Sequence, residues 1–345
     1  MPAVMPVDPI LLARELIDVP SPTGDEKAVG ELIDERLTAF GFATRRYLVT
    51  DSRFNLLATA GGRPRIVLCS HIDTVPPWFA ARDEGEYLFG RGACDTKGII
   101  AAMIAAGERL KQGGVIDFAF LFVVGEETDS VGAKQANRDL ASLGSEFVVV
   151  GEPTESKFAR ASKGALTAFV RFDGVAAHSA YPERGDSAIL KMTRAINEIN
   201  HAEWGFDKVL GVATANVGVV RGGQKPNIVP AVAELEMIIR TVGPPDEVRA
   251  ELEAIVGRHH GHITEHRGNP PMFMHVPEGE PSHVVAFNTD VPHLGNLGQP
   301  LLFGPGSILD AHGASEKIRK DDLVASVATY ERLVRSLLAT GKGPS

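Results

Sequence analysis

Cysteine is scarce in this 345-residue chain, which contains only Cys69 and Cys94. Two cysteines give no disulfide framework, so we expect a protein of the reducing cytoplasm in which both thiols are small, buried core residues. No apolar run is long enough to cross a bilayer, and the first residues lack the basic start and apolar core of a signal peptide. These absences predict a protein with no membrane partner.

Positive charge is also in deficit, because 35 Lys and Arg residues are outnumbered by 44 Asp and Glu residues, for a net charge of -9. This balance argues against a nucleic-acid partner. The hydrophobic content of 44% and the charged content of 23% are ordinary for a globular protein. The chain has no internal repeat, and its length is sufficient for two domains.

Three apolar, strand-like runs each end at residues that can bind a metal ion. They are residues 65–70 before His71 and Asp73, residues 118–124 before Glu126 and Glu127, and residues 147–150 before Glu152. Continuous apolar runs are typical of buried strands in a parallel sheet. Ligands of open α/β sheets bind at the carboxyl ends of such strands, so we expect these side chains to meet at one sheet edge.

Two further candidate ligands lie in glycine-rich segments. Asp95 falls within residues 90–98, directly before an expected helix, and His312 falls within residues 303–316. A pair of metal ions about 3.5–4 Å apart needs a shared carboxylate and one or two further ligands for each ion. The combined set supplies that number and leaves one carboxylate over, which metal-assisted hydrolysis needs as a general base. The pattern therefore predicts a two-metal hydrolase.

Strand-like and helix-like patterns alternate up to about residue 150. This β-α-β order predicts an α/β fold, with a three-layer catalytic domain built on a mostly parallel sheet. From 162 to 271 the pattern changes to half-exposed strands with two helices, which predicts an inserted α+β domain. The catalytic domain would then comprise residues 1–161 and 272–345.

Two local patterns have a purely structural interpretation. Thr23 followed by Glu26 predicts a capping box at the start of a helix. The histidine cluster of residues 258–266 is interpreted as a solvated helix end rather than a third metal site, because no buried strand presents it.

Seven segments carry a family resemblance: HIDTVP, GRGACDTKG, GEET, GEPT, GVAAHSAYPERGDSAI, KPNIVP and AHGASE. They resemble, in the same order, the motifs of the di-zinc amidohydrolase and metallopeptidase family. That family includes acetylornithine deacetylase, succinyl-diaminopimelate desuccinylase, aminoacylase and the glutamate carboxypeptidases. The resemblance spans most of the chain, and the motifs are specific for the family but not for a substrate.

The resemblance implies a role for every candidate residue of the metal centre. The expected metal ligands are His71 and Glu152 for one ion, Glu127 and His312 for the other, and Asp95 as the bridge between them. Glu126 would be the general base and acid, and Asp73 would orient His71. The two divalent ions are expected to be zinc, with cobalt or manganese as alternatives, because metal availability decides as much as the ligands do.

The same resemblance makes the inserted domain a lid that also forms a homodimer. His178 would stabilise the oxyanion from this lid, often across the dimer. Asn227 and Arg240 would hold a substrate carboxylate, and Gly306 would approach the substrate backbone. Two positions depart from the family pattern: Ile238 replaces an acidic residue two before Arg240, and Gly313 replaces the threonine that often follows the last metal ligand.

Relatives that attack amides beside a free carboxylate tend to have Glu at the position of Glu152, whereas aminopeptidase members tend to have Asp. We therefore expect hydrolysis of an N-acyl-L-amino acid, such as N-acetylornithine or N-succinyl-diaminopimelate. A dipeptidase or carboxypeptidase on the same scaffold, acting on a short peptide, is the alternative. A catalytically inactive binding protein is a third possibility, against which the complete ligand set and Glu126 argue.

Overall fold

The computed structural model describes residues 6–340, and these form two compact units. Among the described residues, unit 1 contains 6–160, 274–283 and 289–340. Unit 2 contains residues 161–273 and 284–288. Each unit has its own hydrophobic core.

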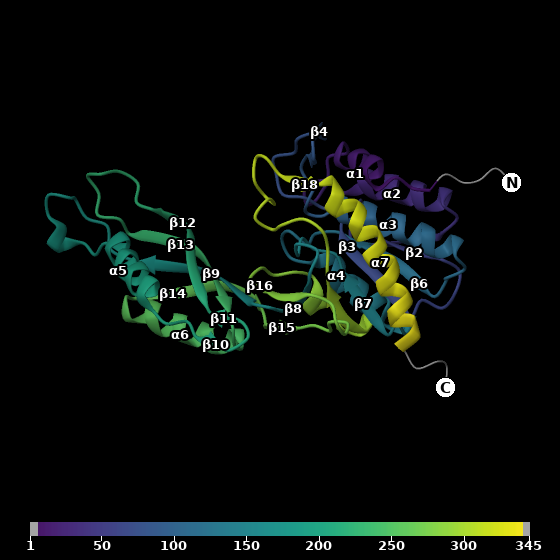
Figure 1. Ribbon diagram of the computed structural model, residues 1–345. Coiled ribbons are helices and arrows are strands. Elements are labelled where there is room, and N and C mark those ends of the chain that lie inside the picture. The colour runs from purple at the N-terminus through teal and green to yellow at the C-terminus, as the bar shows by residue number, and fades with distance from the viewer. Residues whose placement is uncertain (1–5, 341–345) are drawn as a thin grey trace. The chain divides into compact units, whose positions relative to one another are not determined.

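Unit 1 is built on a six-stranded sheet with the strand order β1-β2-β6-β3-β7-β17 (Figure 1). Its strands are β1 (Ala43–Leu48), β2 (Phe54–Thr59), β3 (Ile66–His71), β6 (Phe118–Val123), β7 (Phe147–Val150) and β17 (Gln299–Leu302). Strands β6, β3, β7 and β17 are parallel, whereas β1 and β2 run antiparallel at one edge. The predicted α/β fold with a mostly parallel sheet is confirmed.

Helices cover this sheet in layers. They are α1 (Pro9–Ile17), α2 (Lys27–Ala39), α3 (Lys97–Gln112), α4 (Val131–Asp139) and α7 (Lys320–Thr340). Helices α1, α3 and α7 pack against one another, whereas α4 contacts β2 and β6 (Figure 1).

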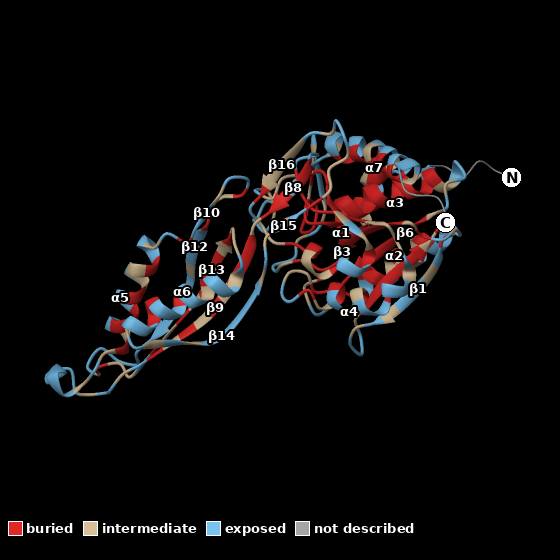
Figure 2. Ribbon diagram, turned by 90° about the horizontal axis from the view of Figure 1, so that it is seen from below, coloured by how far each residue is buried: buried red, intermediate tan, exposed pale blue. Residues whose placement is uncertain are grey.

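The core of unit 1 follows from the alternation of side chains along buried strands. Phe118, Phe120 and Phe122 of β6 point to one face and pack in a cluster with α1, α2, α3 and α7. The intervening Ala119 and Leu121 point to the other face and are also fully buried. A strand buried on both faces reads as one apolar run, which explains its clear sequence signal. Figure 2 shows the buried interior along β3, β6 and α3.

Unit 2 is an antiparallel α+β unit with the sheet order β12-β13-β9-β14. Its elements are β9 (Gly164–Asp173), α5 (Ala188–His201), β12 (Thr214–Gly222), β13 (Val232–Thr241), α6 (Pro245–Arg258) and β14 (Gly261–Asn269). Leu235, Met237 and Ile239 of β13 form a core with residues of α5 and α6. By alternation, Ile238 and Arg240 lie on the opposite face of the sheet.

The remaining elements are short. Three small sheets are formed by β10 (Phe206–Asp207) with β11 (Gly211–Val212), by β8 (Phe158–Ser162) with β15 (Met272–Phe273) and β16 (Ser282–Val285), and by β5 (Tyr87–Phe89) with β4 (Arg82–Glu84) and β18 (Lys317–Arg319). Short 3₁₀ helices are η1 (Ala141–Leu143), η2 (Pro182–Arg184), η3 (Val291–His293) and η4 (Gly295–Leu297). Across residues 6–340, no helix has the length and apolarity needed to cross a membrane.

The capping box predicted at Thr23 and Glu26 is wrong. Helix α2 begins at Lys27, and neither residue caps it through its side chain. Glu26 instead accepts hydrogen bonds from the Arg53 guanidinium, with Nε–Oε2 and Nη2–Oε1 distances of 2.8 and 2.6 Å. The Thr23 hydroxyl donates to the carboxylate of Asp73 at 2.8 Å. Both side chains therefore form hydrogen bonds with residues distant in the sequence, and not with the backbone at the start of α2.

The histidine cluster near residue 260 is not simply a helix end. Helix α6 ends at Arg258, and His262 and His266 lie on the largely exposed strand β14. His259 Nε2 lies 2.7 Å from Glu198 Oε2. Within residues 6–340, one group of at least three side chains could hold a metal ion, and none of these histidines belongs to it. The histidine cluster therefore shows no sign of a metal site.

Candidate metal centre

The parallel register of three strands brings the predicted ligands to one sheet edge. His71 at the end of β3 pairs with Val123 of β6, and Cys69 pairs with Val150 of β7. The pairing continues past the strand ends, because the Ile72 N–H donates to the Val123 carbonyl at 2.9 Å. The turns that follow β6 and β7 therefore begin beside His71.

The side chain of Asp95 lies between the two candidate histidines. Its Oδ1 is 3.0 Å from Nε2 of His71, and its Oδ2 is 3.1 Å from Nε2 of His312. The same Nε2 of His312 is 3.1 Å from Oε1 of Glu127. Oε1 of Glu152 lies 4.0 Å from Nε2 of His71. One carboxylate thus directs one oxygen toward each histidine, which is the arrangement of a bridging ligand.

The donor atoms fit a pair of divalent metal ions. Donors of a tetrahedral site with bonds of ~2.0–2.2 Å lie roughly 3.3 Å apart, which is close to the observed spacings. Donor atoms of His71, Asp95 and Glu127 all lie within 4.8 Å of one another. Oε1 of Glu152 is buried and has no hydrogen-bond partner. A buried carboxylate oxygen without a partner is costly, and a metal ion would satisfy it.

The electrostatics of the cluster show an excess of negative charge. Hydrogen bonds that His312 donates to the carboxylates of Asp95 and Glu127 raise its pKa to about 10. Burial by itself would lower the pKa of His71, but hydrogen bonds to Asp73 and Asp95 raise it well above its ordinary value. Burial, followed by repulsion from Asp95, raises the pKa of Glu152 well above its usual range. Each raised pKa means that the acidic cluster attracts positive charge. Without a metal ion, bound protons provide that charge.

Asp73 has a wider role than the predicted orientation of His71. The ring Nδ1 of His71 lies 3.0 Å from the backbone oxygen of Asp73 and 3.6 Å from its Oδ1. The carboxylate itself accepts the backbone N–H groups of Gly125, Glu126 and Glu127 at 2.9, 3.1 and 3.1 Å. We call residues 125–127 the Glu126 turn. Asp73 therefore holds this turn in place beside His71.

Glu126 lies on this turn among other acidic groups. Burial, followed by repulsion from Glu152, raises its pKa well above the ordinary value. A carboxyl group with a raised pKa can take up a proton near neutral pH and release it again. This behaviour suits the general base and acid predicted from the sequence.

The candidate residues of unit 2 have their own local arrangement. His178 is exposed, and its Nδ1 accepts the Ala180 N–H at 3.1 Å. The neutral ring therefore carries its proton on Nε2, where it can donate. The exposed Asn227 lies beside it, because its carbonyl accepts the Ser179 N–H at 3.1 Å and His178 bridges to Ile228. Arg240 lies on β13, between Thr214 and Ala165 of the neighbouring strands.

Gly306 and the two cysteines lie in unit 1. The φ angle of Gly306 is +87°, and a Cβ atom there would come within 2.8 Å of the Cys94 sulfur, so both conformation and space require glycine. Cys69 and Cys94 are buried free thiols, as expected, and burial raises the pKa of both. Neither thiol is a reactive thiolate.

Sequence reasoning missed Asp290, a fully buried acid. Burial raises its pKa to about 7, against the opposing effect of a hydrogen bond from Ser130. Its Oδ1 has no hydrogen-bond partner. Asp290 contributes to the negative field that raises the pKa of Glu126 and Glu152. The apolar run of residues 284–287 precedes Asp290, but it is separated from it by Asn288 and Thr289 and was not recognised as a signal.

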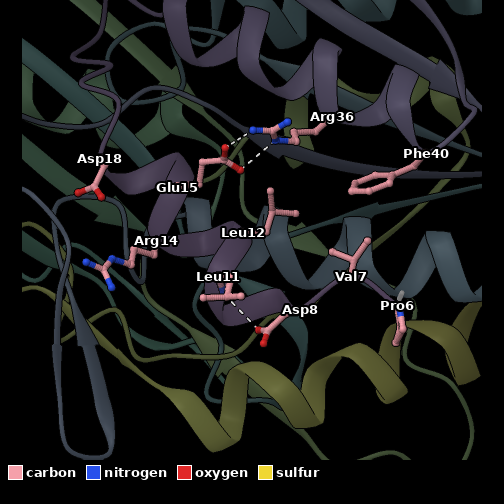
Figure 3. A pocket seen from close by; sticks show the side chains of 10 residues that line it. All are labelled: Pro6, Val7, Asp8, Leu11, Leu12, Arg14, Glu15, Asp18, Arg36 and Phe40. Atoms are coloured by element: carbon pink, nitrogen blue, oxygen red, sulfur yellow. Dashed lines mark hydrogen bonds and ion pairs between the residues drawn. The ribbon is translucent and has the colours of Figure 1, made fainter. Parts of the chain in front are cut away.

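A surface hollow of about 820 Å³ lies apart from these residues, between α1 and α2 (Figure 3). It is lined by Pro6, Val7, Asp8, Leu11, Leu12, Arg14, Glu15, Asp18, Arg36 and Phe40. Glu15 and Arg36 form an ion pair across it. None of the predicted site residues lines this hollow.

Comparison with known proteins agrees with the fold. Residues 160–264 match the peptidase dimerisation domain of the M20 family. A peptidase M20 domain-containing protein of Schizosaccharomyces pombe is 34% identical over 336 residues, covering 94% of this chain and 84% of the relative. A probable carboxypeptidase of Aspergillus clavatus is 31% identical over 368 residues, covering 94% of this chain and 88% of the relative.

Among solved structures, an M20 family metallo-carboxypeptidase from Sulfolobus solfataricus has a TM-score of 0.78 at 16% identity, with 95% of this chain and 98% of that chain covered. This likeness shows a shared fold. The chain belongs to the M20 peptidase family. It is a hydrolase that acts on amide bonds, and the side chains of His71, Asp95 and Glu127 could hold a metal ion.

From the raised pKa of His312 we predict that metal binding depends on pH. Histidine must be neutral to bind a metal ion. With a pKa of about 10, His312 carries a proton at pH 7.5 in the metal-free protein and must release it. We expect zinc binding to release protons and the apparent affinity to rise with pH up to about 10. Titration calorimetry in buffers of different ionisation enthalpy counts these protons, and a His312→Asn variant should release fewer. Affinity that is independent of pH between 7 and 9 would contradict this reading.

Proposed function

We propose that the protein is a two-metal hydrolase that cleaves the amide bond next to a free carboxylate, with short peptides as substrates in a carboxypeptidase reaction. The observation that carries the proposal is the position of Asp95, whose two oxygens each face one histidine, beside the Glu126 turn. Support for a peptide substrate comes from the relative named a probable carboxypeptidase, which is 31% identical. N-acyl-L-amino acids, such as N-acetylornithine or N-succinyl-diaminopimelate, are the second candidate substrates, because they present the same amide and carboxylate.

The proposed ligand sets follow the geometry of the centre. His71 and Glu152 would bind one ion, Glu127 and His312 the other, and Asp95 both. A donor set of imidazole and carboxylate suits zinc, which is our first choice, with cobalt or manganese as alternatives. When bound, a pair of such ions supplies an activated water and polarises the scissile carbonyl.

The protein's own residues would handle the proton. Glu126 is proposed to take the proton of the attacking water on its carboxylate and then deliver it to the departing amine. Asp73 keeps Glu126 at its place by accepting the backbone N–H groups of the turn. Its contact with Nδ1 of His71 would leave the opposite ring nitrogen for the metal ion.

Unit 2 would supply the substrate contacts. His178 is proposed to donate from Nε2 to the oxyanion, and its bond to the Ala180 N–H supports this, because it sets the required tautomer. Asn227 and Arg240 are proposed to bind the substrate carboxylate, for which Arg offers a two-pronged donor. Gly306 would lie against the substrate backbone. The match to a dimerisation domain supports a homodimer formed through unit 2.

The role of Glu126 can be tested by a Glu126→Gln substitution. The amide keeps the shape of the side chain but cannot accept the proton. We expect turnover to fall by about 10²–10⁴-fold, the usual size of a general acid–base contribution. Metal content, measured by mass spectrometry, should stay at the wild-type level. A variant that retains both its metal ions and its turnover would remove Glu126 from the mechanism.

The substrate class can be tested by measuring primary-amine release from a panel of substrates by the metal-loaded protein. The panel contains dipeptides and tripeptides with free or amidated carboxyl ends, and several N-acyl-L-amino acids. Cleavage of free-acid peptides, with amidated peptides at least tenfold slower, is the expected result. Preference for one N-acyl amino acid would instead identify the protein as a deacylase. Equal rates on free and amidated peptides would contradict recognition of the carboxylate.

The dimer proposal makes a prediction about mixed subunits. If His178 acts on the partner's metal centre, a His178→Ala chain and a Glu126→Ala chain should complement each other after subunit exchange. Random pairing into symmetric dimers restores one complete site in each mixed dimer, or roughly a quarter of the wild-type sites. Activity that remains absent after proven exchange would place the action of His178 within its own chain.

A further inference from the structure

Glu316 forms a buried hydrogen-bond centre that the ligand assignment does not explain. Its side chain is fully buried, and Oε1 accepts the backbone N–H groups of Gly92, Cys94 and Asp95 at 3.0, 3.1 and 3.1 Å. Its Oε2 accepts Nη1 of Arg91 at 2.7 Å. We call residues 90–95 the Asp95 turn. One carboxylate therefore satisfies three N–H groups of this turn.

Two other N–H groups of the Asp95 turn have backbone acceptors, because Arg91 donates to the Phe79 carbonyl at 3.1 Å and Ala93 to the Gly90 carbonyl at 3.0 Å. Gly90 and Gly92 have φ angles of +151° and +88°, so the backbone takes a path that other residues rarely adopt. The helix that follows, α3, has Thr96 at its N-cap without a side-chain capping bond. The turn is buried, and a buried N–H group without an acceptor is unfavourable. Glu316 Oε1 thus serves the three N–H groups of this turn that have no backbone acceptor.

The same residue also anchors the segment that carries His312. Glu316 follows His312 by four residues and directly precedes β18, which pairs with β5 just before the Asp95 turn. His312 itself has a φ angle of +60° and a half-exposed side chain, so its loop needs a fixed support. The backbone carbonyl of Glu316 adds a bond from the Gly90 N–H at 3.1 Å. Glu316 therefore joins the loop of one candidate ligand to the turn of another.

The charge of Glu316 is balanced within the structure. Arg91 is fully buried, and its Nε donates to the Pro77 carbonyl at 3.1 Å while Nη1 donates to Glu316. A buried ion pair that is fully hydrogen-bonded is a rigid unit, and removing one partner is expensive. Arg91 therefore fixes the direction in which Glu316 presents Oε1 to the turn.

We propose that Glu316 is a positioning residue of the metal centre, which sets Asp95 against His312 by holding the backbone of the Asp95 turn. The inference rests on the proposed function, because it takes Asp95 and His312 as metal ligands. It resembles the arrangement at Asp73, whose carboxylate accepts three N–H groups of the Glu126 turn. Both turns that carry candidate ligands would thus be held by a buried carboxylate from another part of unit 1.

The test is metal binding rather than turnover. Zinc is titrated into the metal-free full-length protein, and the affinity and number of sites are measured by calorimetry. Loss of a partner that supports a metal ligand commonly weakens affinity about 10–100-fold. We expect Glu316→Ala to approach the upper value. Glu316→Gln should lose about tenfold, because its amide cannot accept from both the turn and Arg91.

A matched control separates positioning from general stability. Ser145→Ala removes the bond from Ser145 Oγ to the Leu297 carbonyl, 2.7 Å long, which lies before the start of β7 and therefore away from the strand ends that carry the ligands. It should lower the unfolding temperature while leaving zinc affinity unchanged. If Glu316→Ala fails to fold, Glu316→Gln carries the test, with its native circular dichroism confirmed.

The outcomes distinguish this inference from the proposed function. Wild-type zinc affinity in a folded Glu316→Gln or Glu316→Ala variant would overturn the positioning role while leaving the metal centre intact. Equal losses of affinity in Ser145→Ala and the Glu316 variants would reduce Glu316 to a structural residue and overturn the inference as well. A wild-type protein without two zinc sites would overturn the proposed function itself, and this inference with it.

Discussion

Repulsion between buried carboxylates is the constraint on which the rest of unit 1 depends. The parallel register of β3, β6 and β7 places Glu126, Glu127 and Glu152 at one sheet edge with His71, and the Asp95 turn adds Asp95 beside them. Acidic groups so close together in a poorly solvated space cannot all be charged without cations. The raised pKa values of His71 and His312, and of Glu126 and Glu152, are two expressions of the same imbalance. The pair of divalent ions proposed for this centre would remove that imbalance.

Backbone hydrogen bonds solve the second problem, which is to keep repelling side chains in place before a metal ion arrives. Asp73 and Glu316 each accept three backbone N–H groups, and each is itself fixed by a further donor, Thr23 and Arg91 respectively. Burial would raise the pKa of Asp73, but contacts with His71 and Thr23 lower it, whereas burial and repulsion from Asp95 raise the pKa of Glu316. The residues that support the candidate site are therefore acidic, like the candidate ligands themselves. The charge of the supporting residues and the charge of the metal centre thus affect each other.

The central strands of unit 1 and the residues at their ends could be predicted from the sequence, because these strands are apolar runs that stop shortly before His, Asp or Glu. The strands β3, β6 and β7 were found for this reason, and the residues after them do converge. Strands β1 and β14 were missed, because they are mostly exposed and carry polar patterns. The supporting roles of Asp73 and Glu316 could not be predicted either. A backbone N–H is present whatever the side chain of the donor residue, so such a bond cannot be recognised from the residue type. Thr23 also matched the pattern of a capping box, although its hydroxyl bonds to Asp73.

Support through the backbone has a consequence for how such a site can change. Oε1 of Glu316 contacts the N–H groups of residues 92, 94 and 95, and so it is indifferent to which side chain stands at position 94. The same holds for the N–H groups that Asp73 accepts. The side chain at position 94 is thus limited by the space beside Gly306 and not by these hydrogen bonds. An exchange of side chain that fits this space would therefore leave the support of Asp95 unaltered.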